Sequence, residues 1–173
     1  VWIIDQMSIT GIKRLSMCGG EPFLFQGLTD IVYYAWENNI QSNITSNGMT
    51  INKLSDYDLK ILADCKCHIN ISVDSFNSEI QSKTRGNHNA LENAIESIKI
   101  LQKKDISVTL LAAISKYNYT DLFSSFKSAY KLGVKEMLYQ PIIAASNYPD
   151  KEKIKKKNEI NISISDIREL NSQ

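Results

Sequence analysis

The stretch that decides the fold is MCGGEP, at residues 17–22. It follows a short strand-like segment at residues 12–17 and precedes an amphipathic segment, which predicts a turn at the carboxyl end of a β-strand. Gly19 and Gly20 allow the backbone to approach a ligand closely and to adopt positive φ. Glu21 places a carboxylate where α/β folds bind ligands, and Pro22 stiffens the exit. The turn is a candidate site for a ligand with a positive group such as an amine. The alternative is an ordinary turn with an exposed glutamate.

Strand-like and helix-like patterns alternate along the rest of the chain. Strands are predicted at residues 13–18, 40–46, 67–74, 106–115 and 134–141, and helices at residues 2–9, 27–38, 55–65, 91–101 and 122–130. Ser55 and Asp58 form a predicted capping box. Residues 76–89 are polar, and neither a helix nor a strand is predicted for them. The alternation implies parallel strands and right-handed crossovers, so the predicted fold class is α/β.

The C-terminal part of the sequence changes character. Residues 144–161 are polar and rich in lysine, and the run at residues 151–157 is read as a solvated face rather than a phosphate site. Residues 163–166 then predict the cap of a final helix at residues 167–170.

Composition and charge restrict the class of protein. The 173 residues fit one domain, and 43% hydrophobic with 23% charged residues is ordinary for a globular fold. A formal net charge of +1 argues against a nucleic-acid-binding surface. No apolar run approaches the roughly 20 residues of a membrane span, so no membrane association is expected. The N-terminal residues do not resemble a signal peptide. Three cysteines, an odd number at positions 18, 65 and 67, predict a reduced, cytoplasmic protein and not a disulfide scaffold.

Polar side chains follow each predicted strand, and in a parallel array all of these strand ends lie on one rim. They are Gly19, Gly20, Glu21, Thr45, Ser46, Asn47, Ser72, Asp74, Asn118 and Gln140. They include no nucleophile–base pair, and both His68 and His88 are read as structural or surface residues. The spacing of Cys65 and Cys67 does not suit zinc. The rim therefore predicts a pocket for a polar small molecule, with any difficult chemistry supplied by a cofactor.

Four segments in register carry a resemblance to a known family. The GGEP segment, residues 45–48 (TSNG), residues 71–75 (ISVDS) and residues 84–86 (TRG) resemble, in this order, the motifs of radical S-adenosylmethionine (SAM) enzymes. The resemblance runs from the start of the chain to about residue 140. It implies a partial (βα)6 TIM-like barrel of parallel strands, missing its first strand. Residues 1–145 would form this core, and residues 146–173 a polar loop and the start of a helix.

The resemblance also implies roles for individual residues. Gly19, Gly20, Glu21 and Pro22 would hold the amino group of SAM, with Glu21 as the partner of the cation. Arg85 would pair with the SAM carboxylate. The remaining expected cofactor-binding residues are Asn47, then Ser72 and Asp74 near the ribose and methionine, and Asn118 and Gln140 on the sugar and adenine side. Asn47 is expected to bind the cofactor without an assigned part of it.

One departure from the family is large. The three-cysteine motif CxxxCxxC that binds the [4Fe-4S] cluster is absent, and the chain begins in what resembles the first helix. We therefore expect a truncated core that is inactive by itself, although the parent protein would cleave SAM reductively to a 5′-deoxyadenosyl radical with an electron donor.

Further expectations concern function and partners. The Arg-Gly pair at residues 85–86 and the sequence at residues 163–170 resemble enzymes with an additional SPASM or twitch domain, many of which modify peptides or proteins. The radical of the parent protein would therefore abstract hydrogen from a peptide, a protein or a small substrate. Alternatives are an activating enzyme for glycyl radical enzymes and a non-catalytic remnant that binds SAM or a partner. An uncovered edge on the first strand predicts self-association.

Overall fold

The computed structural model describes residues 1–142, which divide into two compact units. Unit 1 comprises residues 1–72 and 92–110, and the described part of unit 2 comprises residues 73–91 and 111–142. The predicted boundary at residues 145/146, the lysine run at 151–157 and the helix at 167–170 lie outside the described residues.

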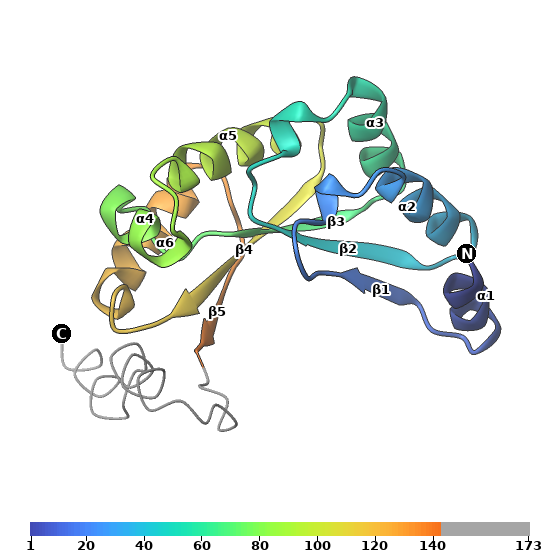
Figure 1. The fold of residues 1–173 in the computed structure, drawn as a ribbon, viewed down its shortest axis with the longest axis horizontal. Helices are drawn as coiled ribbons and strands as arrows, with labels where there is room; N and C mark the ends of the chain where they lie inside the picture. Colours follow the sequence, from blue (N-terminus) through green and yellow to red (C-terminus); the bar gives the residue numbers. More distant parts are fainter. Residues whose placement is uncertain (143–173) are drawn as a thin grey trace. The chain divides into compact units, whose positions relative to one another are not determined.

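Unit 1 holds the N-terminal strands and helices (Figure 1). Its elements are α1 (Trp2–Ile9), β1 (Arg14–Met17), η1 (Pro22–Leu24), α2 (Leu28–Glu37), β2 (Gln41–Ser46), η2 (Ile51–Lys53), α3 (Asp56–Asp64) and β3 (His68–Ser72), with most of α5 (Ala90–Lys103) and the first half of β4 (Ser107–Ile114). Helix α2 packs on α3 and β2. The predicted capping box of α3 is present, because Ser55 and Asp58 bond to each other's backbone N–H groups.

The core of unit 1 is built from one side of each strand. Ile44 in β2 and Ile69 and Ile71 in β3 have no exposed surface. The other side of these strands is polar: Asn70 Nδ2 donates to Asn43 Oδ1 at 2.9 Å and to Thr45 Oγ1 at 3.3 Å. This alternation has the period of two that the sequence predicts for residues 67–74.

Unit 2 contains one helix, α4 (Ser78–Arg85), that the sequence pattern does not predict. The elements of this unit are α4, the second half of β4, η3 (Tyr119–Asp121), α6 (Leu122–Lys131) and β5 (Met137–Pro141). Helix α4 is polar, and its one buried residue is Gln81. The Asn77 side chain caps its start, and Gly86 ends it with φ of 68°. Its two ends define this helix, because it has no apolar stripe.

The strands form one parallel sheet in chain order, β1-β2-β3-β4-β5. Arg14 of β1 aligns with Gln41 of β2, and Asn43 of β2 aligns with His68 of β3. This topology confirms the predicted α/β fold class of the partial TIM-barrel type. Because β1, β2 and β3 run in the same direction, their carboxyl ends lie on one edge of unit 1.

Candidate functional site

The Gly-Gly turn follows β1 in unit 1, as predicted. Gly19 has φ of 129°, a conformation that residues with side chains rarely adopt, whereas the φ of Gly20 lies outside that range. A Cβ atom built at either position has no neighbouring atom within 4 Å. The turn therefore leaves open space beside its backbone.

The Glu21 carboxylate is held against the end of β2. Its Oε1 accepts a hydrogen bond from Ser46 Oγ at 2.8 Å and a longer one from Phe23 N at 3.3 Å, and Oε2 accepts from Asn47 N at 2.8 Å. A carboxylate has about four lone-pair positions, so these bonds orient it and leave capacity for a further donor. Glu21 is half-buried, which strengthens any ion pair that it makes.

The loop after β2 is shaped by its own side chains. Asn47 Oδ1 accepts from Met49 N at 2.8 Å, and Ser46 Oγ accepts from Gly48 N at 3.0 Å. Gly48 has φ of 77°, and a Cβ there would lie 3.2 Å from the backbone of Ala94 in α5. Ser97 Oγ donates to the Gly48 carbonyl oxygen at 2.5 Å. The close packing of this loop on α5 fixes the residues that hold Glu21.

A second cluster of predicted site residues lies within unit 2, around Asp74. Arg85 Nη2 donates to Asp74 Oδ1 at 2.6 Å, and Ala113 N donates to the same oxygen at 2.8 Å. Asp74 is 3% exposed, whereas the Arg85 side chain is 29% exposed. The buried carboxylate thus anchors an arginine that reaches solvent, and Arg85 has further N–H donors for an anion.

Gln81 supports this cluster, although nothing in the sequence singles it out. Its Oε1 accepts from Asp74 N at 2.8 Å and from Ser75 N at 3.1 Å, and the residue is 1% exposed. A buried glutamine in a polar helix leaves no trace in hydrophobic periodicity, so only the tertiary contacts identify it.

Asn118 is buried, whereas the sequence predicts that its side chain lines the cofactor site. It has no exposed area; Nδ2 donates to the carbonyl oxygens of Asp74 and Ala113 at 2.8 and 2.9 Å, and Oδ1 accepts from Ser115 N at 2.8 Å. Both ends of the amide are used inside unit 2. Asn118 therefore braces the loop after β4, and its expected contact with the cofactor stays a prediction.

The other predicted residues are placed as follows. Ser72 ends β3 in unit 1 and is half-buried, and Gln140 lies in β5 of unit 2 and is exposed. His68 is hydrogen-bonded through its ring nitrogens to Ser107 Oγ at 3.0 Å and Thr109 Oγ1 at 2.9 Å, which is a structural arrangement.

The cysteines are free thiols in different surroundings. Cys18 is exposed, whereas Cys65 and Cys67 are buried. Burial raises the pKa of the Cys67 thiol to about 12. Within residues 1–142 no group of three His, Cys, Asp or Glu side chains is arranged to hold a metal ion. The [4Fe-4S] cluster that the family resemblance implies thus has no fitting ligand set among the described residues. The predicted cytoplasmic location stays a prediction.

The comparison with known proteins identifies the family. The Radical SAM superfamily matches residues 3–135. The chain belongs to the radical SAM superfamily. No helix in the described part of the chain is long and apolar enough to span a membrane.

Two curated relatives each match about three quarters of the chain. The AdoMet-dependent heme synthase of Methanosarcina barkeri is 25% identical over 130 residues, which is 75% of this chain and 37% of the relative. The antilisterial bacteriocin subtilosin biosynthesis protein AlbA of Bacillus subtilis is 25% identical over 135 residues, which is 78% of this chain and 30% of AlbA. The chain thus spans about a third of the length of these relatives.

Solved structures show the same fold. Streptococcus suis SuiB aligns with a TM-score of 0.77 at 18% identity, covering 99% of this chain and 37% of SuiB. SuiB bound to the precursor peptide SuiA aligns with a TM-score of 0.75, also at 18% identity, over 99% of this chain and 36% of SuiB. At this identity the likeness concerns the fold alone.

Proposed function

We propose that this chain is the SAM-binding part of a radical SAM enzyme that modifies a peptide. The observation that carries the proposal is the Glu21 carboxylate, which two donors at the end of β2 orient at 2.8 Å directly after an open Gly-Gly turn. An oriented, half-buried carboxylate beside accessible backbone is suited to an ammonium group such as the methionine amine of SAM.

The residues of the chain fit SAM in chemical terms. Gly19, Gly20, Glu21 and Pro22 would hold the amino group, and the main chain at Asn47 keeps Glu21 in place. Arg85, anchored by Asp74, would take the carboxylate, and Ser72 and Gln140 would contribute polar contacts. Asn118 would act by positioning Asp74. When bound, and after one-electron reduction, SAM would supply a 5′-deoxyadenosyl radical that removes a hydrogen atom from the substrate.

No step is assigned to an iron–sulfur cluster, because Cys18, Cys65 and Cys67 do not fit one. The sequence of these 173 residues contains no CxxxCxxC motif, and two of its three thiols are buried. The electron that reduces SAM, and the donor of that electron, are therefore part of the proposal for the whole protein and not for these 173 residues.

The peptide substrate is proposed from the names of relatives. AlbA acts in the biosynthesis of a bacteriocin, and SuiB has been crystallised with a precursor peptide. The heme synthase shows that relatives of similar identity differ in substrate class. The competing proposal is therefore a small-molecule substrate. It would be favoured if the whole protein does not modify a peptide but acts on a small molecule.

Calorimetric titration of the purified chain with SAM tests the site. We expect weak but saturable binding, and we expect Glu21→Gln to weaken it by about tenfold, because a charge-assisted hydrogen bond is lost. Glu92→Gln is the matched control, since Glu92 is an exposed acid of α5. Absence of SAM binding by the unmodified chain, or binding that Glu21→Gln leaves unchanged, would overturn the assignment.

A further inference from the structure

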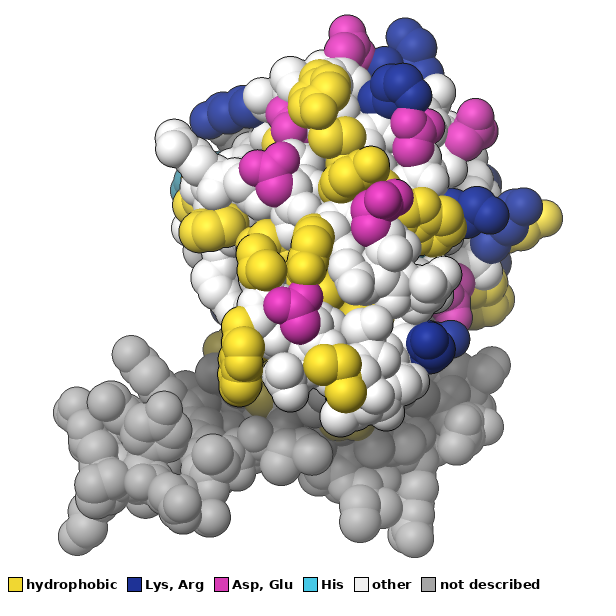
Figure 2. All heavy atoms as spheres, turned by 90° about the vertical axis from the view of Figure 1, so that its right-hand side faces the viewer, with side chains coloured by type: hydrophobic (Ala, Val, Ile, Leu, Met, Phe, Trp, Pro, Cys, Tyr) yellow, Lys and Arg dark blue, Asp and Glu magenta, His cyan; other side chains and the backbone are white. Residues whose placement is uncertain are grey.

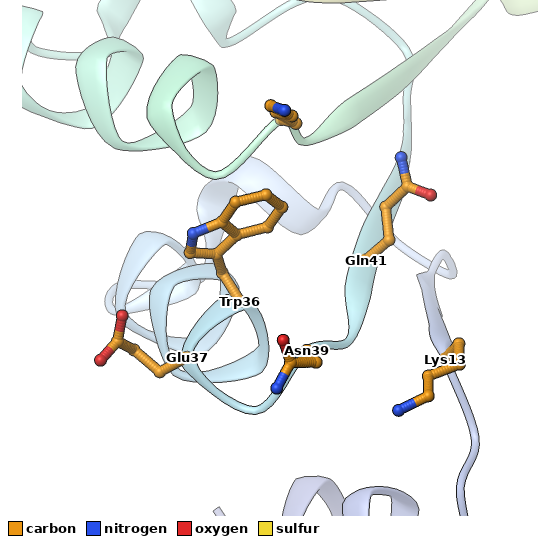
Figure 3. A pocket seen from close by; sticks show the side chains of 6 residues that line it. Lys13, Trp36, Glu37, Asn39 and Gln41 are labelled. Atoms are coloured by element: carbon orange, nitrogen blue, oxygen red, sulfur yellow. The ribbon is translucent and has the colours of Figure 1, made fainter.

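A hollow of about 580 Å³ lies in unit 1 at the opposite ends of the strands from the Gly-Gly turn. Lys13 immediately precedes β1, Gln41 begins β2, and Lys66 lies two residues before β3. The end of α2 and the following turn complete the wall. The six lining residues are Lys13, Trp36, Glu37, Asn39, Gln41 and Lys66 (Figure 3).

The hollow contains an aromatic ring that is only partly buried. Helix α2 buries Leu28, Val32 and Ala35, but Trp36 remains 37% exposed. Lys66 Nζ lies 5.9 Å from the centroid of the indole ring, near the limit of a cation–π contact. A partly exposed indole with a lysine ammonium over its ring favours a ligand that combines a planar ring with a negative charge.

The charges around the indole are unequal. Lys13 and Lys66 come from different segments, whereas Glu37 is the one acid among the lining residues. In Figure 3 the Glu37 side chain lies on the other side of Trp36 from Gln41 and Lys13. The side of the hollow that holds Lys13 also holds the amides of Asn39 and Gln41, which both donate and accept hydrogen bonds.

We propose that this hollow binds a small aromatic anion of about the size of a mononucleotide. The planar ring stacks on Trp36, the positive charges of Lys13 and Lys66 attract the anionic group, and Asn39 and Gln41 bond to polar atoms at its edge. The volume falls within the roughly 300–1,000 Å³ of small-molecule sites. This site is separate from the proposed SAM site, because the two lie at opposite ends of β1 and β2.

Fluorescence titration with uridine monophosphate tests the proposal. A pyrimidine nucleotide is used because the SAM site is proposed to take an adenosine group. The Trp2→Leu variant leaves Trp36 as the single tryptophan. We expect saturable quenching by the nucleotide, and binding at least about tenfold weaker for uridine and for inorganic phosphate, since each lacks half of the recognised chemistry.

Variants locate the binding within the hollow. Lys66→Asn removes the charge and keeps a residue that tolerates the positive φ of 49° found there. We expect this variant, and Trp36→Leu measured by calorimetry, to weaken nucleotide binding by about tenfold. Lys99→Gln on the exposed side of α5 serves as the control and should bind as the unmodified chain does.

Three results would overturn the proposal. The first is that Lys66→Asn and Trp36→Leu leave nucleotide binding unchanged. The second is that uridine monophosphate gives no saturable quenching of Trp36 in the Trp2→Leu variant. The third is an oligoglutamate peptide that binds more tightly than the nucleotide, which would assign the hollow to an acidic protein segment. Glu21→Gln should not alter nucleotide affinity, so failure of the SAM proposal is recognised separately.

Discussion

At the scale of single residues, the two glycines of the turn have different reasons to be glycine. Gly19 has φ of 129°, so a side chain there strains the folded backbone, whereas Gly20 has neither a positive φ in that range nor a neighbour within 4 Å. We expect Gly19→Ala to lower the free energy of unfolding by about 1–3 kcal/mol. Gly20→Ala should leave it unchanged or raise it by up to about 1 kcal/mol.

The same pair of variants separates folding from binding. If SAM approaches the backbone at Gly20, Gly20→Ala should weaken its affinity by about tenfold or more although the fold is intact. Urea unfolding followed by circular dichroism measures the stability, and calorimetry measures the affinity. A Gly20→Ala variant that binds SAM as tightly as the unmodified chain would contradict the close approach.

The roles of buried polar residues show where prediction from sequence stops. The GGEP segment predicts the position of Glu21, and the structure adds that Ser46 and Asn47 orient it. Asn118 follows a strand and reads as a ligand contact, yet it is buried and satisfied by backbone groups. A strand-end position is visible in sequence, whereas the direction and partners of the side chain are set by tertiary packing.

At the scale of elements, the capping box of α3 is a test of local structure. Ser55 Oγ accepts from Asp58 N at 3.1 Å and donates to Asp58 Oδ2 at 2.5 Å, and Thr29 of α2 donates to Oδ1 at 3.0 Å. We expect Ser55→Ala to lower the free energy of unfolding at neutral pH by about 1 kcal/mol. Ser124→Ala, at an exposed position of α6, should have little effect.

The effect of Ser55→Ala should depend on pH. The Ser55 hydroxyl is the main cause that lowers the pKa of Asp58, with a smaller lowering contribution from Thr29. A carboxyl with a lowered pKa stabilises the fold above its unfolded pKa of about 4, and this contribution disappears as the pH falls through the folded pKa. The stability difference between variant and unmodified chain should therefore shrink below about pH 4. A difference that stays constant from pH 7 to that range would contradict the role of Asp58.

Most elements could be predicted because their apolar residues repeat with a clear period. The helix at residues 122–130 is present as α6, but Phe123 and Tyr130 are 69% and 72% exposed, so the period locates the helix without showing what packs on it. Helix α4 is not predicted, because its residues are polar and show no apolar period. Asn77, Lys83, Arg85 and Gly86 are the start and stop signals that identify it.

At the scale of the whole molecule, β1 is the first strand of the sheet order and pairs with β2. The Lys13 carbonyl oxygen accepts from Gln41 N at 2.9 Å, so the backbone groups of residues 13, 15 and 17 face β2. Those of Arg14 and Ser16 face the other way. Figure 2 shows hydrophobic side chains on the face that corresponds to the right-hand side of Figure 1, the side on which α1 and the N-terminus are drawn. In and beside α1, Val1, Trp2 and Ile9 are 72–79% exposed.

An edge strand beside exposed apolar side chains favours pairing between copies of the chain. We expect the 173-residue chain to sediment as a dimer or larger species at micromolar concentration. Ser16→Pro removes an N–H that faces away from β2, where residues 1–142 supply no further strand. It spares the ladder to β2, so it should yield a monomer with an unchanged circular dichroism spectrum. Leu15→Pro removes an N–H that faces β2 and should unfold the strand. If the Ser16→Pro variant still associates, the contact between copies involves the α1 side chains and not the edge of β1. If the unmodified chain is a monomer, neither surface mediates association.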